Sequence, residues 1–169
     1  MDTYCEQLVK MRKGAKYYFC MFGIWFAEIV FAFFCLVVPY LRFLSAILIV
    51  ASGYGAYYLC GFLSVEYEYI ITNGTLDIDI IYSKRTRKRL ASYELSDVES
   101  IEKYSGDVLD KHKYRNLTVA CNTDDPQSYK LLFSGDNGIS AAVISPNERT
   151  REEIVKFVPK FVGNTAFKQ

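Results

Sequence analysis

The sequence predicts a chain of two parts: a membrane hairpin of two α-helices, and a strongly bent, seven-stranded antiparallel sheet with one C-terminal helix. Between Tyr17 and Leu63 the only charged residues are Glu28 and Arg42, although the 169-residue chain holds twenty basic and nineteen acidic residues. After Leu63, apolar and polar residues alternate as they do in strands. The last segment repeats apolar residues at helical spacing instead. One apolar block joined to one polar block excludes a single globular core.

The apolar block, residues 17–63, is predicted to cross a membrane twice, over about 18–38 and about 43–63. Each stretch has about 21 residues, and roughly 20 residues of helix span the hydrocarbon core of a bilayer. Between the stretches, Pro39 cannot continue a helix, and Arg42 is suited to the interface. The sequence therefore predicts a helical hairpin with a very short connecting loop.

The segment before the hairpin, residues 1–16, is predicted to be cytoplasmic. Tyr4, Leu8 and Met11 recur at helical spacing, which predicts a short helix lying on the inner membrane surface. Four basic residues precede the first span and five lie within residues 84–89, whereas the connecting loop carries one. Because Lys and Arg are concentrated on the cytoplasmic side, we expect a multi-pass protein of the cell inner (plasma) membrane with both termini cytoplasmic.

Glu28 lies near the middle of the first span, where an ionised carboxylate is costly. It could act as a proton or ion relay, or as the contact with another membrane subunit. We favour a neutral carboxyl that hydrogen-bonds across the hairpin to Ser45, Ser52 or Tyr54, because a relay normally needs several ionisable groups. The second span also holds two pairs of small residues that favour close helix packing, within the hairpin or in self-association: Ala51 with Gly55, and Ser52 with Ala56.

Residues 64–162 are predicted to form a cytoplasmic β-domain. Alternating apolar and acidic residues predict a first strand over 65–71, and Asn73-Gly74 is typical of a tight hairpin turn. The same alternation, interrupted by turn residues, predicts six more strands, at 76–80, 87–95, 98–104, 117–121, 129–133 and 139–144.

The C-terminal helix of this domain has clear start and stop residues. Ser145 is predicted as its N-cap, Pro146 as its first residue, and Glu148 as the partner in a capping box. Pro159 is expected to end or kink it, and residues 163–169 form a tail. Its apolar stripe is predicted to consist of Ile154, Phe157, Val158 and Phe161.

The hairpin segment Tyr69–Gly74, the motif Leu95–Ile101 and the helix start Ile144–Glu148 together resemble the bacterial pleckstrin-homology-like (PH-like) domain. The resemblance covers roughly residues 64–162 and implies an α+β or all-β PH-like fold, which in this family is commonly found after paired transmembrane helices. The whole chain is also similar to an uncharacterised family of short bacterial membrane proteins. The shared motifs are structural, so they imply a fold and supply no catalytic residue.

The densest charged cluster is predicted at the tip between the second and third strands, and consists of Lys84, Arg85, Arg87, Lys88 and Arg89. The resemblance implies a tip at which some PH-like domains contact phosphorylated lipid headgroups. A basic side chain near an anionic leaflet contributes about 1 kcal/mol. Two alternatives stay open: a solvated tip that partly neutralises acidic residues on neighbouring strands, and a contact with a protein partner.

We expect no enzyme, no cofactor and no metal site. The single histidine, His112, lies in a polar loop, and the sequence contains none of the common catalytic or phosphate-binding motifs. Asp77 and Asp79 face outward from a predicted strand, and the pair Asp124 and Asp125 is typical of a turn. The five cysteines lack metal-ligand spacing, and a net charge of +1 gives no argument for nucleic-acid binding.

The sequence thus predicts a membrane-anchored, non-enzymatic binding or scaffold protein. Its expected partners are membrane lipid with anionic headgroups, a membrane or cytoplasmic protein, and a second copy of the chain. Contact would be made through the basic tip, an exposed strand edge or the hairpin itself. The alternative function is a small accessory subunit of a larger membrane transport or secretion complex, engaged through Glu28 and the small-residue face.

Overall fold

The computed structural model describes residues 3–106, 109, 111–122, 125–135, 138–164 and 166–167. The chain divides into two compact units. The helical unit consists of residues 12–65 and 82–85, and the sheet unit consists of residues 1–11, 66–81 and 86–169. Parts of two predicted turns (124 and 136–137) and of the predicted tail (165 and 168–169) lie outside the described residues.

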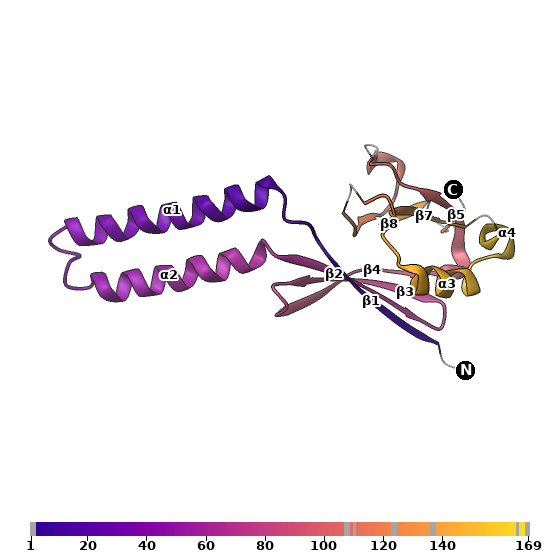
Figure 1. The fold of residues 1–169 in the computed structure, drawn as a ribbon, viewed down its shortest axis with the longest axis horizontal. Coiled ribbons are helices and arrows are strands. Elements are labelled where there is room, and N and C mark those ends of the chain that lie inside the picture. Colours follow the sequence, from indigo (N-terminus) through magenta and orange to yellow (C-terminus); the bar gives the residue numbers. More distant parts are fainter. Residues whose placement is uncertain are drawn as a thin grey trace. The chain divides into compact units, whose positions relative to one another are not determined.

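The helical unit contains two antiparallel helices, α1 (Ala15–Val37) and α2 (Ser45–Phe62), which pack side by side (Figure 1). Both are long and apolar enough to cross a membrane. Helix α1 ends two residues before Pro39, as predicted, since the proline ring disfavours a helical conformation in the residue before it. The buried face between the helices includes Cys35 and Ala56.

In the sheet unit, strand β1 (Tyr4–Lys10) precedes the helices in sequence and pairs antiparallel with β2 (Val65–Thr72), which follows them. The pairing runs from Tyr4 opposite Thr72 to Lys10 opposite Glu66. The two long helices are therefore inserted into the connection between two neighbouring strands of one sheet.

The predicted surface helix within residues 1–16 is wrong, because residues 4–10 form a strand. Tyr4 and Leu8 are exposed, whereas Cys5 between them is buried in the core of the sheet unit. Residues four positions apart share a face in a helix and also in a strand, so Tyr4 and Leu8 fitted both periods. Residues 4–10 form a strand because pairing with β2 satisfies their backbone hydrogen bonds and buries the face that carries Cys5.

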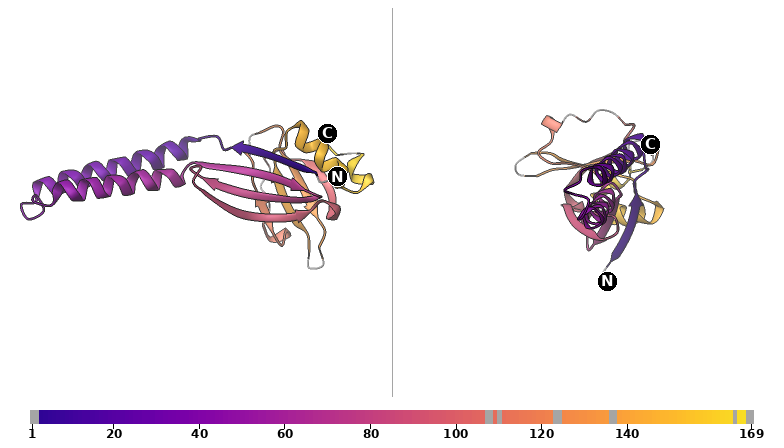
Figure 2. Two further views of the ribbon diagram at one scale, coloured as in Figure 1. Left: turned by 90° about the horizontal axis from the view of Figure 1, so that it is seen from below. Right: turned by 90° about the vertical axis from the view of Figure 1, so that its left-hand side faces the viewer.

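The first sheet has the order β1-β2-β3-β4, with β3 over Thr75–Tyr82 and β4 over Thr86–Glu94. Figure 2 shows β2, β3 and β4 as neighbouring strands of one layer. The turn predicted between β2 and β3 is confirmed, since Asn73 has a φ of 50° and Gly74 a φ of 93°. Positive φ at both central residues is what a type I′ turn requires.

The second sheet has the order β5-β7-β8-β6. Its strands are β5 (Val98–Lys103), β6 (Leu117–Val119), β7 (Tyr129–Phe133) and β8 (Ser140–Ile144), and β6 runs parallel to β8. The described residues thus form two four-stranded sheets, which corrects the prediction of one seven-stranded antiparallel sheet. Alternation identifies strands but does not show which strands pair, and the eighth strand, β1, lies before the hairpin.

Residues from both sheets and from the C-terminal helices form one core. Its largest fully buried aliphatic side chains are Ile71, Leu76, Ile78, Leu95, Leu131, Ile144 and Ile154. The Tyr69 hydroxyl lies among them, donates to the backbone oxygen of Ala120 and accepts from the backbone N–H of Ser145 at 3.1 Å. Burial raises the pKa of Tyr69. One buried hydroxyl therefore links β2 to the ends of two segments of the second sheet.

Helix α3 (Glu148–Phe157) begins after Asn147, whose side chain accepts from the N–H of Thr150 at 2.8 Å. The predicted cap, Ser145, is instead buried and bonded to Ser128. Gln7 of β1 holds this helix start, because it donates to the oxygen of Ser145 at 2.9 Å and accepts from the N–H of Asn147 at 2.8 Å.

Helix α3 ends before Pro159, as predicted, and a short helix α4 (Lys160–Gly163) follows. Ile154 and Val158 of the predicted stripe are buried, and Phe157 packs against the core. Phe161 is 70% exposed, and Val162 is buried in its place. The new helix after the proline has a different phase, so the stripe of α3 does not continue into it.

Candidate membrane-surface site

The turn between β3 and β4 carries the first two residues of the predicted basic cluster. Ser83 and Lys84 have φ values of 50° and 58°, and the N–H of Arg85 donates to the oxygen of Tyr82 at 2.9 Å. Non-glycine residues with positive φ are strained by roughly 1 kcal/mol or more and persist only where the surroundings hold them. The contacts of this turn with α2 supply that support.

Tyr82–Arg85 belongs to the helical unit and lies against the C-terminal end of α2. The N–H of Ser83 donates to the oxygen of Ser64 at 2.8 Å. The rings of Tyr82 and Phe62 meet edge to face, with centroids 6.1 Å apart. A Cβ at Gly61 would lie 3.3 Å from the Ser83 hydroxyl oxygen, so the absence of a side chain there permits this close approach.

Arg85 is joined to α2 by its own side chain. Its Nη2 donates to the Tyr57 hydroxyl at 2.8 Å, and its guanidinium carbon lies 5.2 Å from the centroid of the Tyr57 ring. Tyr57 lies near the C-terminal end of α2. Sequence spacing could not show that it receives Arg85, because the two residues belong to different elements.

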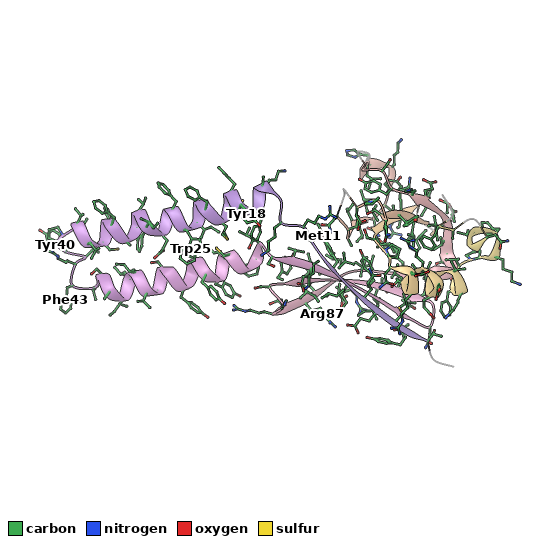
Figure 3. The ribbon with its side chains drawn as sticks, in the orientation of Figure 1. Met11, Tyr18, Trp25, Tyr40, Phe43 and Arg87 are labelled. Atoms are coloured by element: carbon green, nitrogen blue, oxygen red, sulfur yellow. The ribbon has the colours of Figure 1, made fainter. Side chains whose placement is uncertain are left out.

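The same end of the helical unit holds a set of basic residues that we call the basic collar: Arg12, Lys13, Lys16, Lys84 and Arg85. Lys13 lies over the ring of Tyr17 at 4.8 Å, so a basic residue meets an aromatic ring beside both helices. The opposite end of the hairpin has one basic residue, Arg42, while Tyr40 and Phe43 are more than nine-tenths exposed there (Figure 3). The charge of this unit is therefore concentrated at one end.

Arg87 and Arg89 are held differently, by carboxylates of neighbouring strands in the sheet unit. The Nη2 of Arg87 lies 2.6 and 2.8 Å from the two carboxylate oxygens of Glu68. Arg89 lies 3.0 Å from Asp77 and 3.1 Å from Asp79. These pairs match the alternative in which the tip neutralises acidic residues on neighbouring strands. They also divide the predicted five-residue cluster, because Arg87 and Arg89 are paired in the sheet unit while Lys84 and Arg85 lie in the helical unit. Lys88, between the two arginines, is exposed.

Glu68 is nearly fully buried although it lies on the outer face of the first sheet. Its pKa is raised, first by burial and then by a hydrogen bond with Glu6 of the neighbouring strand. The pKa of Glu6 is lowered, chiefly by a hydrogen bond from the Tyr4 hydroxyl. Arg87 opposes the shift of Glu68 by its positive charge. The Arg87 guanidinium therefore has a structural role. It pairs with the Glu68 carboxyl, whose other surroundings disfavour the ionised form.

Within the helical hairpin, Glu28 accepts a hydrogen bond from the Ser52 hydroxyl at 2.8 Å. This confirms the predicted bond across the hairpin and selects Ser52 from the three hydroxyls, since Ser45 donates to the oxygen of Arg42 and Tyr54 is exposed. The pair opens into a groove of about 380 Å³, lined by Ile24, Ala27, Glu28, Phe31, Ser52, Gly55, Ala56 and Leu59.

The small residues of α2 do not share one role. Ala56 is buried and Ser52 bonds to α1, so the pair Ser52 and Ala56 packs within the hairpin, which is one of the two alternatives left open by the sequence. Gly55 lines the groove beside Glu28. Ala51 is exposed and lines a separate, shallow apolar hollow on α2.

The other residues considered in the sequence fall outside this site. His112 is exposed, and Asp125 accepts from the backbone N–H of Gln127 at 2.9 Å, as a turn residue does; Asp124 lies outside the described residues. Over the described parts of the chain, no group of three or more His, Cys, Asp or Glu side chains is arranged to hold a metal ion.

Comparison with protein families matches residues 1–164 to the family described as Bacterial PH-like domain (DUF6106). The matched segment includes β1 and both helices as well as the two sheets. Neither the curated proteins nor the solved structures contain a match to the chain.

Proposed function

This chain belongs to the bacterial PH-like domain family, and we propose that it is a membrane-anchored, non-enzymatic binding module of the cytoplasmic membrane surface. In this proposal α1 and α2 cross the membrane, and Lys84 and Arg85 contact anionic lipid headgroups. The position of the β3–β4 turn supports this function best, because that turn packs against the end of α2 as part of the helical unit.

The chemistry of the basic collar supports a headgroup contact. Tyr57 and Tyr82 are aromatic residues of the kind that gather at the interface, and Arg85 keeps its charged end beside them. Each basic side chain near an anionic leaflet contributes about 1 kcal/mol within a Debye length. A module that its own helices hold at the surface needs only weak contacts, since its effective concentration there is high.

The division of the basic cluster decides which residues are proposed for this contact. Arg87 and Arg89 already pair with Glu68, Asp77 and Asp79. Releasing them to bind a headgroup would leave nearly buried carboxylates without their partners, which is unfavourable. The headgroup contact is therefore assigned to Lys84 and Arg85, with the N-terminal residues of the collar beside them.

The test measures which lipids stay with the full-length chain when it is extracted, in polymer-bounded discs, from bilayers that mix neutral and anionic lipid. We expect the wild-type protein to retain anionic lipid above its bulk fraction, and high salt to weaken that enrichment. The variant Lys84→Gln/Arg85→Gln should lose much of it. The matched control Arg87→Gln/Arg89→Gln removes the same charge and should keep it. Equal enrichment in both variants would overturn the headgroup contact.

The groove beside Glu28 favours a second candidate function, that of an accessory subunit that packs against another membrane protein. The two functions separate by cross-linking of the full-length chain in native membranes, read together with the lipid measurement. An accessory subunit should lose its cross-linked species on Glu28→Gln and keep them on charge reversal at Lys84 and Arg85. A surface-binding module should show the reverse dependence.

A further inference from the structure

Strands β4 and β6 each lie at the end of their sheet, so each has one edge that is unpaired in its sheet. Residues 90–93 of β4 and residues 115–118 at β6 line one hollow of about 420 Å³. We call it the edge groove. Its volume falls within the range of ligand-binding sites, roughly 300–1,000 Å³. Two consecutive stretches of backbone form its walls, so unpaired N–H and C=O groups are among the groups that a ligand meets there.

The charges along β4 protect only half of its edge. Arg87, Lys88 and Arg89 occupy the first half of the strand, and charged side chains are a common defence against unwanted strand pairing. Residues 90–93 carry no charge, and this segment is the one that lines the groove. The uncharged part of the β4 edge lies inside a hollow, so it can pair with one short added strand.

The side chains around the groove define what would fit. Tyr93 forms a fixed wall, since its ring stacks on Phe133 with centroids 4.3 Å apart and its hydroxyl lies 2.9 Å from the Thr118 hydroxyl. Leu90, 42% exposed, offers an apolar contact. Arg115 supplies a positive charge, and none of the described residues that line the hollow is acidic. The chemistry is complementary to an extended backbone that bears an acidic side chain.

We propose that the edge groove binds an extended, acidic peptide segment of a partner protein, which pairs with β4 as an added strand. The proposal rests on the binding role proposed above and names the class of partner. Strand addition draws affinity from main-chain hydrogen bonds and specificity from side-chain pockets. A single strand is favoured over a second folded copy of the chain. Because β6 bounds the groove opposite β4, the edge of a whole sheet would collide with β6.

The experiment uses the full-length protein in lipid discs and a display library of random peptides of about twelve residues. Enriched peptides are then synthesised, and their dissociation constants are measured by fluorescence anisotropy. We expect enriched sequences to alternate apolar and acidic residues. The variant Leu90→Glu should weaken binding at least about tenfold. Its matched control is Leu8→Glu, which changes a leucine of similar exposure, 46%, on the opposite edge of the same sheet.

A second measurement tests the strand pairing itself. Methylation of alternate backbone nitrogens in the enriched peptide should abolish binding in one of the two alternating patterns and spare it in the other. The proposal is overturned if no peptide is enriched, if Leu90→Glu and Leu8→Glu bind alike, or if both methylated peptides bind as the parent does. It is also overturned if the groove edge instead holds a dimer that Leu90→Glu dissociates. The lipid-enrichment measurement does not depend on this groove, so the two proposals can fail separately.

Discussion

Lys10 and Glu66 lie opposite each other on neighbouring antiparallel strands, although residues 11–65 and both long helices separate them in sequence. The strand that enters the helical hairpin and the strand that leaves it therefore belong to one sheet. Both ends of the hairpin must lie on the same side of any membrane that the two helices cross. The pairing of β1 with β2 is independent of the charge pattern that predicted cytoplasmic termini, and it too requires the two ends of the hairpin to lie on one side.

We predict that replacing residues 11–65 by Asn-Gly yields a soluble, folded domain, because Lys10 and Glu66 would then flank a two-residue hairpin turn. Residues 66–169 alone should fail to fold, since they lack the edge strand that supplies Cys5 to the core and Gln7 to the helix start. Circular dichroism melts of the two chains check this. A cooperative melt of residues 66–169 at the same temperature would contradict it.

Gln7→Ala should destabilise this soluble domain by about 2 kcal/mol, because two hydrogen bonds of about 1 kcal/mol each are lost at the start of α3. Chemical denaturation measures the change. The exposed Gln127→Ala is the control and should alter the free energy of unfolding by no more than about 0.5 kcal/mol. Similar effects of the two substitutions would show that Gln7 does not hold the helix start.

Tyr69→Phe should lower the free energy of unfolding by about 1–3 kcal/mol at neutral pH. The substitution keeps the ring in the core but leaves the backbone N–H of Ser145 and the oxygen of Ala120 without the hydroxyl. Denaturant titration of the soluble domain measures the loss. Tyr114→Phe, at a partly exposed position of the same soluble domain, gives the matched control.

The same hydroxyl predicts an alkaline loss of stability. Burial raises the pKa of Tyr69 in the folded state, so folding holds a proton that the unfolded chain releases. The protonated Tyr69 hydroxyl contributes fully to the free energy of unfolding below the unfolded-state pKa of about 10. This contribution falls as the pH rises above that value. The free energy of unfolding, measured from pH 8 to 11, should therefore fall more steeply for the wild type than for Tyr69→Phe. Parallel curves would contradict the shift.

Arg87→Gln should destabilise the sheet unit, because it leaves nearly buried Glu68 without its cationic partner. The Arg87 side chain is 53% exposed, so solvent screening limits the expected loss to about 1–2 kcal/mol. Lys88→Gln removes the same charge from the exposed residue between the two arginines and should have little effect. Thermal melts compare them, and equal melting temperatures would show that the ion pair is not stabilising.

The sequence by itself determined the features that depend on residues close together in the chain. The strand at residues 129–133 has the predicted bounds, the tight turn lies at Asn73-Gly74 as predicted, and Pro159 separates α3 from α4. The bond across the hairpin could also be foreseen, since a carboxyl within an apolar span requires a nearby donor. Period, turn chemistry and proline geometry act locally, so a single sequence displays them.

The tertiary structure alone decided which distant segments meet. It made residues 4–10 a strand, because β2 offers a partner that the local pattern does not reveal. It divided the strands between two sheets and moved the cap of α3 to Asn147, where Gln7 holds the backbone. It also assigned Arg85 to Tyr57 and Arg87 to Glu68. These two arginines are only two positions apart in sequence, yet their surroundings differ because long-range pairing assembles them.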